Sequence, residues 1–447
     1  MDTNENQSAA NNDIAAENVF LQTQTRATHS QLFGWLVFGI GAVFYSYEFL
    51  LRILPSVMVP DLMQVHHIST AGLGYLAAIY SVIYTAMQLP VGLLIDWYGP
   101  RRLLLLASVI CAIGSFFFAS ASSLILAGIG RLLIGFGSAF GFVGVLRLAS
   151  LWLPPYRFAL ATGLVTTLGM IGGVLGDVGL SHLVVTAGWR AAVLLSAWVG
   201  VALMLVFYFI PEMRHHSFTR GERGQQWQQL RKQTWAILCM PVIWLNGLAG
   251  SLLYVPLSAF GELWGVSYLQ TVQNLSRVEA AIAVSWLMCG WAIGAPLAGW
   301  LADKTGNRYR VVIAGSAISL AVILYILHTQ FASHTGLFSA MLMFGIMCSG
   351  QILMMVIVRD VCPHYLLATG MAVTNMIIMA GGIIFQPLIG ELIKSHSNAL
   401  ISNAKSVAVN QNYTHAMYVI PAAILLAIVV LVFQMLLHKG KDKTCNQ

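Results

Sequence analysis

Charged residues are scarce in this chain of 447 residues, at 9% of the total, whereas apolar residues make up 58%. A soluble domain carries about 25% charged residues. A water-soluble enzyme of this length would expose too much apolar surface, so the composition argues against that class and favours a protein with several membrane spans. The net charge of +7 needs no nucleic-acid partner to explain it, because basic residues also mark one side of a membrane.

Several chemical signatures are absent. The six cysteines include no CxxC pair and no neighbouring His at metal-ligand spacing, so neither a disulfide framework nor a metal site is expected. No GxxxxGK[ST] sequence occurs, which argues against ATP hydrolysis by this chain. No catalytic dyad is present, so we expect no enzymatic activity and no cofactor.

Twelve apolar segments are long enough to cross a membrane. We estimate them at residues 33–55, 71–92, 103–123, 124–149, 159–182, 190–210, 240–262, 280–301, 311–329, 336–358, 367–392 and 415–437. The one long polar interruption divides them six and six and contains a candidate amphipathic helix at 225–233. The expected fold is an all-α membrane protein of two six-helix bundles, organised as a disordered cytoplasmic tail (1–30), an N-terminal bundle (31–210), a cytoplasmic linker (211–238), a C-terminal bundle (239–437) and a cytoplasmic tail (438–447).

The distribution of Lys and Arg predicts the orientation. With the N-terminus inside, sixteen of the 23 basic residues fall in inner segments and four in outer segments. This is a positive-inside bias. Both termini and the central linker are therefore expected in the cytoplasm, and the absence of a cleaved signal favours a bacterial inner (plasma) membrane.

An internal repeat supports a duplicated unit. The stretch GLLIDWYGPRR begins at Gly92 and GWLADKTGNRYR begins at Gly299, an offset of 207 residues that also relates two LATG stretches, at 160–163 and 367–370. A duplicated six-helix unit is an expected origin of transporter halves. In each loop the first Gly would allow close helix contact, and the Asp and Arg would form a charged latch that breaks when the protein changes conformation.

These loops resemble those of the major facilitator superfamily of secondary transporters, and the resemblance covers about residues 31–437. Two positions of the first loop depart from the family pattern: Trp97 stands where a basic residue is usual, and Pro100 where Arg is common. A run from Arg131 through Gly135 and Gly137 resembles the family's helix-four motif, which is associated with proton coupling. A glycine run beginning at Gly163 resembles the helix-five motif of antiporters without its usual Pro. The resemblance implies a conformational gate formed by Gly92, Asp96, Gly99, Arg101, Arg102, Gly299, Asp303, Lys304, Gly306 and Arg308.

Charges inside spans are costly and often functional. Glu48, Arg131 and Asp177 share a predicted depth of roughly 9–12 Å from the outer edge, from a rise of 1.5 Å per residue. They are our candidates for proton coupling, in one buried polar cluster. Glu48 could pair with Arg52, with Arg131 or with a proton. The alternative is a static salt-bridge network that fixes helix packing.

Further candidates concern the substrate. Arg147, near the inner end of its span, could bind an anion or reach the cytoplasmic interface. Glu262 is expected at the outer interface. In the resembled family, helices one, four, seven and ten line the central cavity, and carrying this over completes the predicted substrate-binding set: Tyr45, Glu48, Arg131, Arg147, Asn246, Tyr254 and Gln351.

The expected function is secondary transport of a small polar solute by alternating access. The buried Arg and Glu favour an anionic or zwitterionic substrate, such as an organic acid, an amino acid or a short peptide. Two alternatives stay open: efflux of hydrophobic drugs or cations by antiport, and a membrane nutrient sensor that does not transport. The expected partners are the substrate, protons in the coupled case, and membrane lipids; the chain is expected to be a monomer.

Overall fold

A computed structural model describes residues 32–154, 157–211, 220–363, 366–397 and 405–444 of the protein. The described residues form helices joined by short turns and contain no strand. Twelve helical stretches are long and apolar enough to cross a membrane, which confirms the expected number of spans and the all-α fold. The predicted disordered tail at 1–30 lies outside the described residues. We number the spans 1 to 12 in chain order.

The first six spans cover residues 32–209. Span 1 (Leu32–His66) contains the 3-10 segment η1 and the helix α2, and span 5 (Leu160–Ala187) contains the π-helical segment η3. The bounds are η1 (Leu54–Met58), α2 (Val59–His66), α3 (Thr70–Tyr98), α4 (Pro100–Ser120), α5 (Leu124–Ser138), α6 (Gly141–Trp152), α7 (Phe158–Val174), η3 (Leu175–Gly179), α8 (Leu180–Ala187) and α9 (Trp189–Phe209).

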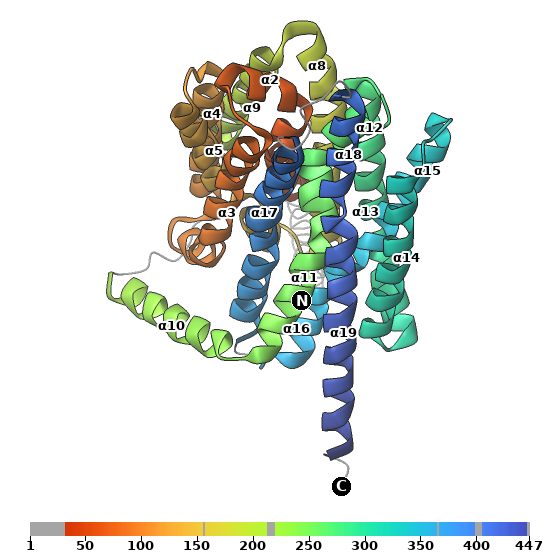
Figure 1. The fold of residues 1–447 in the computed structure, drawn as a ribbon. Helices are drawn as coiled ribbons and strands as arrows, with labels where there is room; N and C mark the ends of the chain where they lie inside the picture. The colour runs from red at the N-terminus through yellow and green to blue at the C-terminus, as the bar shows by residue number, and fades with distance from the viewer. Residues whose placement is uncertain (1–31, 155–156, 212–219, 364–365, 398–404, 445–447) are drawn as a thin grey trace, which may run out of the picture.

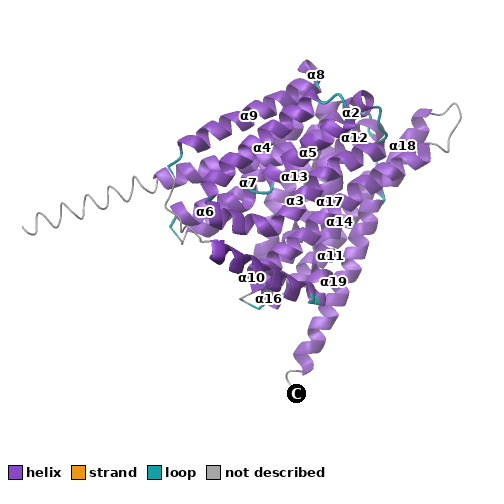
Figure 2. Ribbon diagram, turned by 90° about the vertical axis from the view of Figure 1, so that its left-hand side faces the viewer, coloured by secondary structure: helices purple, strands orange, loops and turns teal. Residues whose placement is uncertain are grey.

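A helix longer than predicted, α10 (Arg220–Leu238), precedes the last six spans. These contain α11 (Pro241–Val255), the π-helical segment η4 (Pro256–Trp264), α12 (Gly265–Val272), α13 (Arg277–Thr305), α14 (Arg308–His328), α15 (His334–Cys348), the 3-10 segment η5 (Ser349–Ile352), α16 (Leu353–Val361), α17 (Leu367–Ser397), α18 (Lys405–Met417) and α19 (Val419–Thr444). In the views of Figures 1 and 2, α10 lies across one end of the molecule, and α19 extends beyond the other helices at that end.

Spans 1 and 7 are longer than the sequence predicts, which is a correction. We expected them to end at 55 and 262, whereas they continue to His66 and Val272. Proline normally ends a helix because it lacks an N–H and crowds the preceding turn. Pro55 and Pro256 instead stand at the starts of η1 and η4, where the altered helix geometry accommodates them. The next charged residues after these prolines, Asp61 and Glu262, are therefore inside spans 1 and 7.

The two sets of six spans meet along two seams. At one, α3 packs along α17; at the other, α7, η3 and α8 pack against α13. At the first seam the backbones approach so closely that a Cβ on Gly390 would lie 2.5 Å from the carbonyl oxygen of Thr70. Small residues permit such approach between helices in a membrane. The division into two bundles with the proposed bounds stays a prediction.

One end of the molecule joins both sets of spans through polar contacts. It carries α2, α8 and α12 (the upper end in Figure 1), and we call it the predicted outer end. There Arg277 lies 2.8 Å from Asp61, and the Thr70 hydroxyl donates a hydrogen bond of 2.7 Å to the carbonyl oxygen of Gly390. The opposite end, with α10 and α16, is the predicted inner end. These contacts join the two sets of spans at the predicted outer end in this conformation.

Candidate functional site

The centre of the molecule contains an ion pair on span 1. Glu48 and Arg52 are four residues apart and therefore lie on one face of the helix. Their side chains meet at 2.6 Å, and both are buried. The Tyr80 hydroxyl of span 2 donates a second hydrogen bond to the same Glu48 oxygen, also at 2.6 Å. Charged hydrogen bonds of this kind compensate part of the cost of burying the two charges.

Arg52 also reaches the last six spans. Its guanidinium lies 3.7 Å from Glu262 and donates to the Tyr254 hydroxyl at 3.3 Å. Tyr254 in turn donates to Glu262 at 2.7 Å. One arginine thus binds a carboxylate from each half of the molecule. Breaking the contact with Glu262 would be part of any separation of the two halves at this depth.

Arg131 of span 4 lies beside this network. Its guanidinium donates to the carbonyl oxygen of Leu51 at 3.0 Å and stands 4.8 Å from the centre of the Tyr80 ring. Aromatic rings also cover Arg52, whose guanidinium carbon is 4.6 Å from the centre of the Phe49 ring and 4.7 Å from that of Tyr84. A cation over an aromatic face is stabilised electrostatically, most strongly where water is excluded. We call Glu48, Arg52, Arg131 and Glu262 the central charge cluster; it contains two arginines and two carboxylates.

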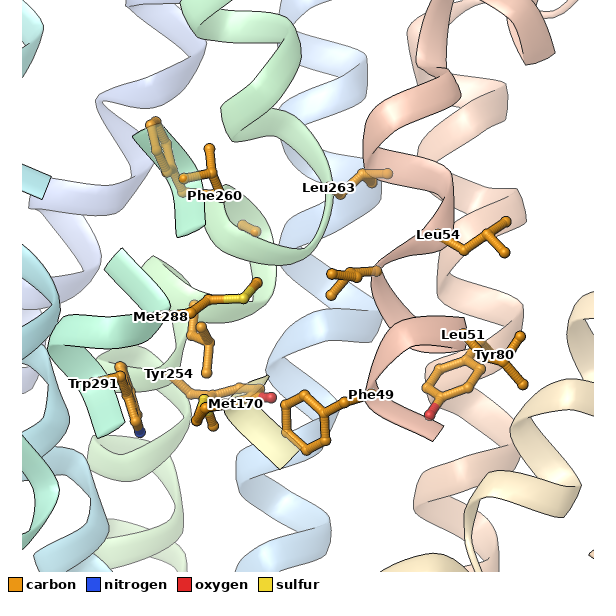
Figure 3. Close-up of a cluster of buried hydrophobic side chains, with 14 of the residues drawn as sticks. Phe49, Leu51, Leu54, Tyr80, Met170, Tyr254, Phe260, Leu263, Met288 and Trp291 are labelled. Atoms are coloured by element: carbon orange, nitrogen blue, oxygen red, sulfur yellow. The ribbon is translucent and has the colours of Figure 1, made fainter. Parts of the chain in front are cut away.

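A small cavity adjoins the central charge cluster between the two halves. It measures about 10 Å³, room for about one water molecule. In the view of Figure 3, Phe49 lies between Tyr254 on one side and Tyr80 on the other. An organic solute would need the helices to separate here. The lining comprises Arg52, Tyr80, Ser81, Tyr84, Thr85, Tyr254, Ser258, Glu262, Met379 and Gly382.

The structure brings some of the predicted site residues together. Glu48, Arg131 and Tyr254 belong to the central network. Tyr45 is buried beside Phe49, with ring centres 5.3 Å apart, and Asn246 donates to the carbonyl oxygen of Met354 at 2.8 Å. Tyr45, Asn246 and Gln351 do not line the cavity. Their role in binding stays a prediction.

Two predicted positions need correction. Glu262, expected at the outer interface, is buried in the middle of span 7, because the span continues for ten residues beyond it. The uncharged stretch from 263 to 272 is the signal in the sequence that could have shown this. Asp177, expected in one cluster with Glu48 and Arg131, has a separate hydrogen bond of 3.0 Å from Ser56.

Arg147 lies at the first repeated loop. Its guanidinium is 3.2 Å from Asp96, and both side chains are about half exposed, at 46% each. Arg101 anchors the same loop by donating to the carbonyl oxygens of Phe207 and Tyr208 at the end of span 6. The structure therefore associates Arg147 with the gate residues rather than with the central cavity.

The second repeated loop uses a different pair. Arg308 forms an ion pair with Asp360 at the end of span 10, and Lys304 stands 5.0 Å from the centre of the Trp300 ring. Gly306 ends α13 with a φ of 63°, a conformation that glycine adopts without steric cost. Each loop therefore has an Asp–Arg ion pair, but the pairs are not equivalent. The first loop contributes its aspartate, Asp96, whereas the second contributes its arginine, Arg308.

Gly92 and Gly299 do not have the expected role in this conformation. We expected these glycines to permit close helix contact. A Cβ at either position would meet no atom within 4 Å, because these helix faces are not packed against a neighbour here. Four glycines of span 5 behave otherwise, at 169, 172, 173 and 176: a Cβ on Gly172, for example, would lie 2.0 Å from the carbonyl oxygen of Ser46 on span 1. These four serve helix packing, whereas a Cβ on Gly163 would meet no atom within 4 Å.

Trp97, which departs from the family pattern, contacts the linker helix. Its indole N–H donates to Gln226 of α10, and the Arg223 guanidinium stands 5.0 Å from the centre of the neighbouring Tyr98 ring. Farther along α10, Gln233 accepts a hydrogen bond of 3.1 Å from Thr369 of span 11. The linker helix therefore contacts both halves at the predicted inner end. Among the described residues, no group of three or more His, Cys, Asp or Glu could hold a metal ion.

Comparison with known proteins identifies the family of this chain. The sequence profile of the Major Facilitator Superfamily matches residues 34–387. A probable sulfoacetate transporter of Cupriavidus necator is 24% identical over 64% of this chain and 71% of its own. The membrane sensor protein UhpC of Escherichia coli K12 is 23% identical, and that match spans 57% of this chain and 61% of the sensor's length.

A solved structure shows the same fold. The bacterial homologue of the human lysosomal transporter Spinster, in an inward-facing and occupied conformation, has a TM-score of 0.72. It is 16% identical, and the superposition covers 90% of this chain and 96% of the homologue. At this identity the likeness shows the arrangement of helices and says nothing about the substrate.

Proposed function

Since the chain belongs to the Major Facilitator Superfamily of membrane transporters, we propose that it carries a small organic anion across the membrane together with a proton. As a multi-pass protein of this family, it takes a small molecule as substrate. The proposal depends on the position of Arg52. This arginine is bound to Glu48 and Glu262 and lines the small cavity between the two halves. An anion entering this cavity would compete with the carboxylates for the arginine.

The charge balance links the anion to a proton. Two arginines and two carboxylates leave the central charge cluster neutral when all four groups are ionised. A proton on Glu48 or Glu262 would weaken that carboxylate's hold on Arg52 and leave one positive charge in excess. A bound monoanion would restore neutrality, and a dianion such as sulfoacetate would do so with both carboxylates protonated; buried charges are stable only when they are compensated. Proton and anion would therefore bind together and leave together, which is symport.

Two further points support this proposal. One relative whose name gives a substrate is a probable transporter of sulfoacetate, a small organic anion. The polar contacts between the halves at the predicted outer end fit an inward-facing state, in which the outer side is closed and both termini lie in the cytoplasm. Efflux of hydrophobic cations is disfavoured, because Arg52 lines the cavity and Arg131 lies beside it.

Uptake by the purified chain in proteoliposomes tests the proposal. The panel contains sulfoacetate, other organic acids, sugar phosphates and a hydrophobic cation, each with and without a pH gradient that is alkaline inside. We expect an organic anion to accumulate only with the gradient. Accumulation of the cation alone would overturn the anion assignment, and binding of an anion without transport would favour the sensor alternative that the likeness to UhpC raises.

A variant pair tests the coupling. Glu48→Gln removes the ionisable group and keeps the shape, so we expect gradient-driven accumulation to be lost while anion exchange continues. The matched control is Glu279→Gln, since Glu279 is a partly exposed capping residue at the start of α13 and Gln preserves that cap. If Glu48→Gln accumulates the anion as well as the control does, proton coupling at Glu48 is wrong.

A further inference from the structure

A second buried carboxylate lies apart from the central charge cluster. Asp177 belongs to η3, is fully buried, and accepts one hydrogen bond, from the Ser56 hydroxyl of η1 at 3.0 Å. Its other oxygen, Oδ2, is buried and has no hydrogen-bond partner among the described residues. A single hydroxyl is a weak partner for a carboxylate, because an ionised carboxylate can accept about four hydrogen bonds.

No cation compensates Asp177 within the described residues. The elements packed against η3 are α7, α8, α13 and η1, and its neighbour Gly176 contacts Leu50 and Ile53 of span 1. Arg277 of α13 is bound to Asp61, and Arg52 of span 1 is bound to Glu48. The remaining titratable or charged groups on these elements are His182 on α8, Glu279, Cys289, Asp303 and Lys304 on α13, and none of them forms an ion pair with Asp177.

Burying an ionised carboxylate without a partner is strongly unfavourable, and a protein group in this position neutralises instead. The simplest neutral form is the carboxylic acid, with the proton on one of the two oxygens. The surroundings of Asp177 in this conformation therefore favour the protonated acid.

The position of Asp177 connects this proton to the opening of the molecule. η3 packs against α13 of the last six spans, and η1, which carries Ser56, packs against η4. Three segments that depart from α-helical geometry thus meet where the two halves touch, toward the predicted outer end. Short π-helical segments occur frequently at functional sites. Separation of the halves along this line would admit water to the carboxyl group.

We propose that Asp177 is a proton-binding site that controls the outer side of the transporter, a role that rests on the proposed alternating access. The outer side closes with the proton bound, and the proton leaves when the seam opens and water reaches the carboxylate. Since the closed state binds the proton and the open state does not, low pH favours closure by linkage. With one proton involved, the ratio of closed to open molecules changes at most tenfold per pH unit.

Distance measurements between spin labels test this in the absence of any substrate. Gln64→Cys in α2 and Thr335→Cys in α15 place labels on exposed residues at the predicted outer end of each half. Cys239, Cys289 and Cys445 are replaced by serine; the other three cysteines are buried. In lipid bilayers we expect the short-distance population to grow as the pH falls. In Asp177→Asn, which mimics the protonated form, we expect it to dominate at every pH.

Two control variants distinguish the effect of Asp177 from the effects of neighbouring residues. Asp61→Asn breaks the ion pair with Arg277, so it lowers the short-distance population but keeps the pH response. Ser56→Ala keeps the carboxyl group but removes its one hydrogen-bond donor, so we expect the response to persist with its midpoint at a higher pH. This displaced midpoint tests the proposal if Asp177→Asn does not fold, and an unchanged midpoint would count against it. A pH response in Asp177→Asn equal to that of the parent, or a parent without any response, would overturn the proposal. Because no substrate is present, failure of uptake in the proteoliposome panel would instead count against the proposed function.

Discussion

The first and last six spans carry the same loop motif but very different buried charge. Glu48, Arg52, Arg131 and Asp177 are buried in the first six spans, whereas Glu262 is the one buried charged residue of the described part of the last six. The offset of 207 residues that relates the loops pairs none of these charges with another charged residue: Glu48 corresponds to Val255, and Arg131 to Phe338.

This difference separates two requirements of a transporter. The repeated loops are the predicted gate of both halves, so a duplicated unit can serve both. Binding of an anion and a proton at the centre needs only one set of charged groups. Duplicating four buried charges would double the free-energy cost of burying them. The last six spans contribute Glu262 and Tyr254, which complete a cluster based on the first six. We infer that the repeat supports the movement and the asymmetry supports binding.

Removing Arg52 tests this asymmetry most severely. Arg52→Met leaves Glu48 and Glu262 buried without the cation they share, so we expect a loss of about 3–5 kcal/mol of stability. Thermal unfolding in detergent measures it. The control Arg310→Met changes an exposed arginine at the predicted inner end and should leave the unfolding temperature nearly unchanged. The double variant Arg52→Met, Glu48→Gln should recover part of the loss; no recovery would mean that charge compensation is not what Arg52 provides.

Arg131 gives a smaller effect that concerns binding. In Arg131→Lys the charge stays, while the planar stacking on Tyr80 and the fixed direction of the bond to Leu51 are lost. We expect affinity for the transported anion to fall about tenfold, since a buried cation–π contact contributes up to about 2 kcal/mol. Isothermal titration with the anion found in the uptake panel measures this. Unchanged affinity would show that Arg131 only packs against Tyr80.

The ion pair at the predicted outer end joins the halves through partly exposed groups. Arg277→Gln removes the contact with Asp61, whose side chain is 29% exposed, so we expect about 0.2–1 kcal/mol less stabilisation of the closed state. This is at most a fivefold shift in the closed population, read from the distance between labels on Gln64 and Thr335. A larger shift would mean that this pair, and not the central charge cluster, holds the two halves together.

The smallest effect belongs to the repeated loops. Arg147→Gln removes an ion pair with Asp96 in which both groups are half exposed, so anion affinity should change less than twofold. The matched change in the other loop, Arg308→Gln, removes the pair with Asp360 and should likewise spare affinity while altering the uptake rate. A tenfold loss of affinity in Arg147→Gln alone would return Arg147 to the substrate site and break the division between loops and centre.

Several features could be predicted from the sequence because they depend on local or repeated patterns. The twelve spans and the all-α fold follow from apolar length, and the family follows from the repeated loops. Span 1 was predicted too short because proline normally signals a helix end, yet Pro55 stands at the start of a 3-10 segment within a continuing span. Span 7 was predicted to run through Pro256 but to end at 262, whereas it continues through η4 to Val272.

The site was predictable in part. The spacing of four residues brings Glu48 and Arg52 together on any helix, so this pairing could be anticipated as one option. The contribution of Glu262 could not, because it depends on how span 7 packs against span 1. A common depth in the membrane likewise placed Asp177 with Glu48 and Arg131, although depth does not give the direction in which a side chain points.

The sequence by itself determined the spans, the duplicated loops and the presence of a few charges that a membrane interior tolerates only when they are neutralised or paired. Only the tertiary structure decided the partners. It joined Arg52 to carboxylates from both halves and left Asp177 with a single hydroxyl. The physical reason is that the cost of burying a charge is known from its position in a span, whereas its compensation depends on neighbours distant in the chain that packing brings within a few ångströms.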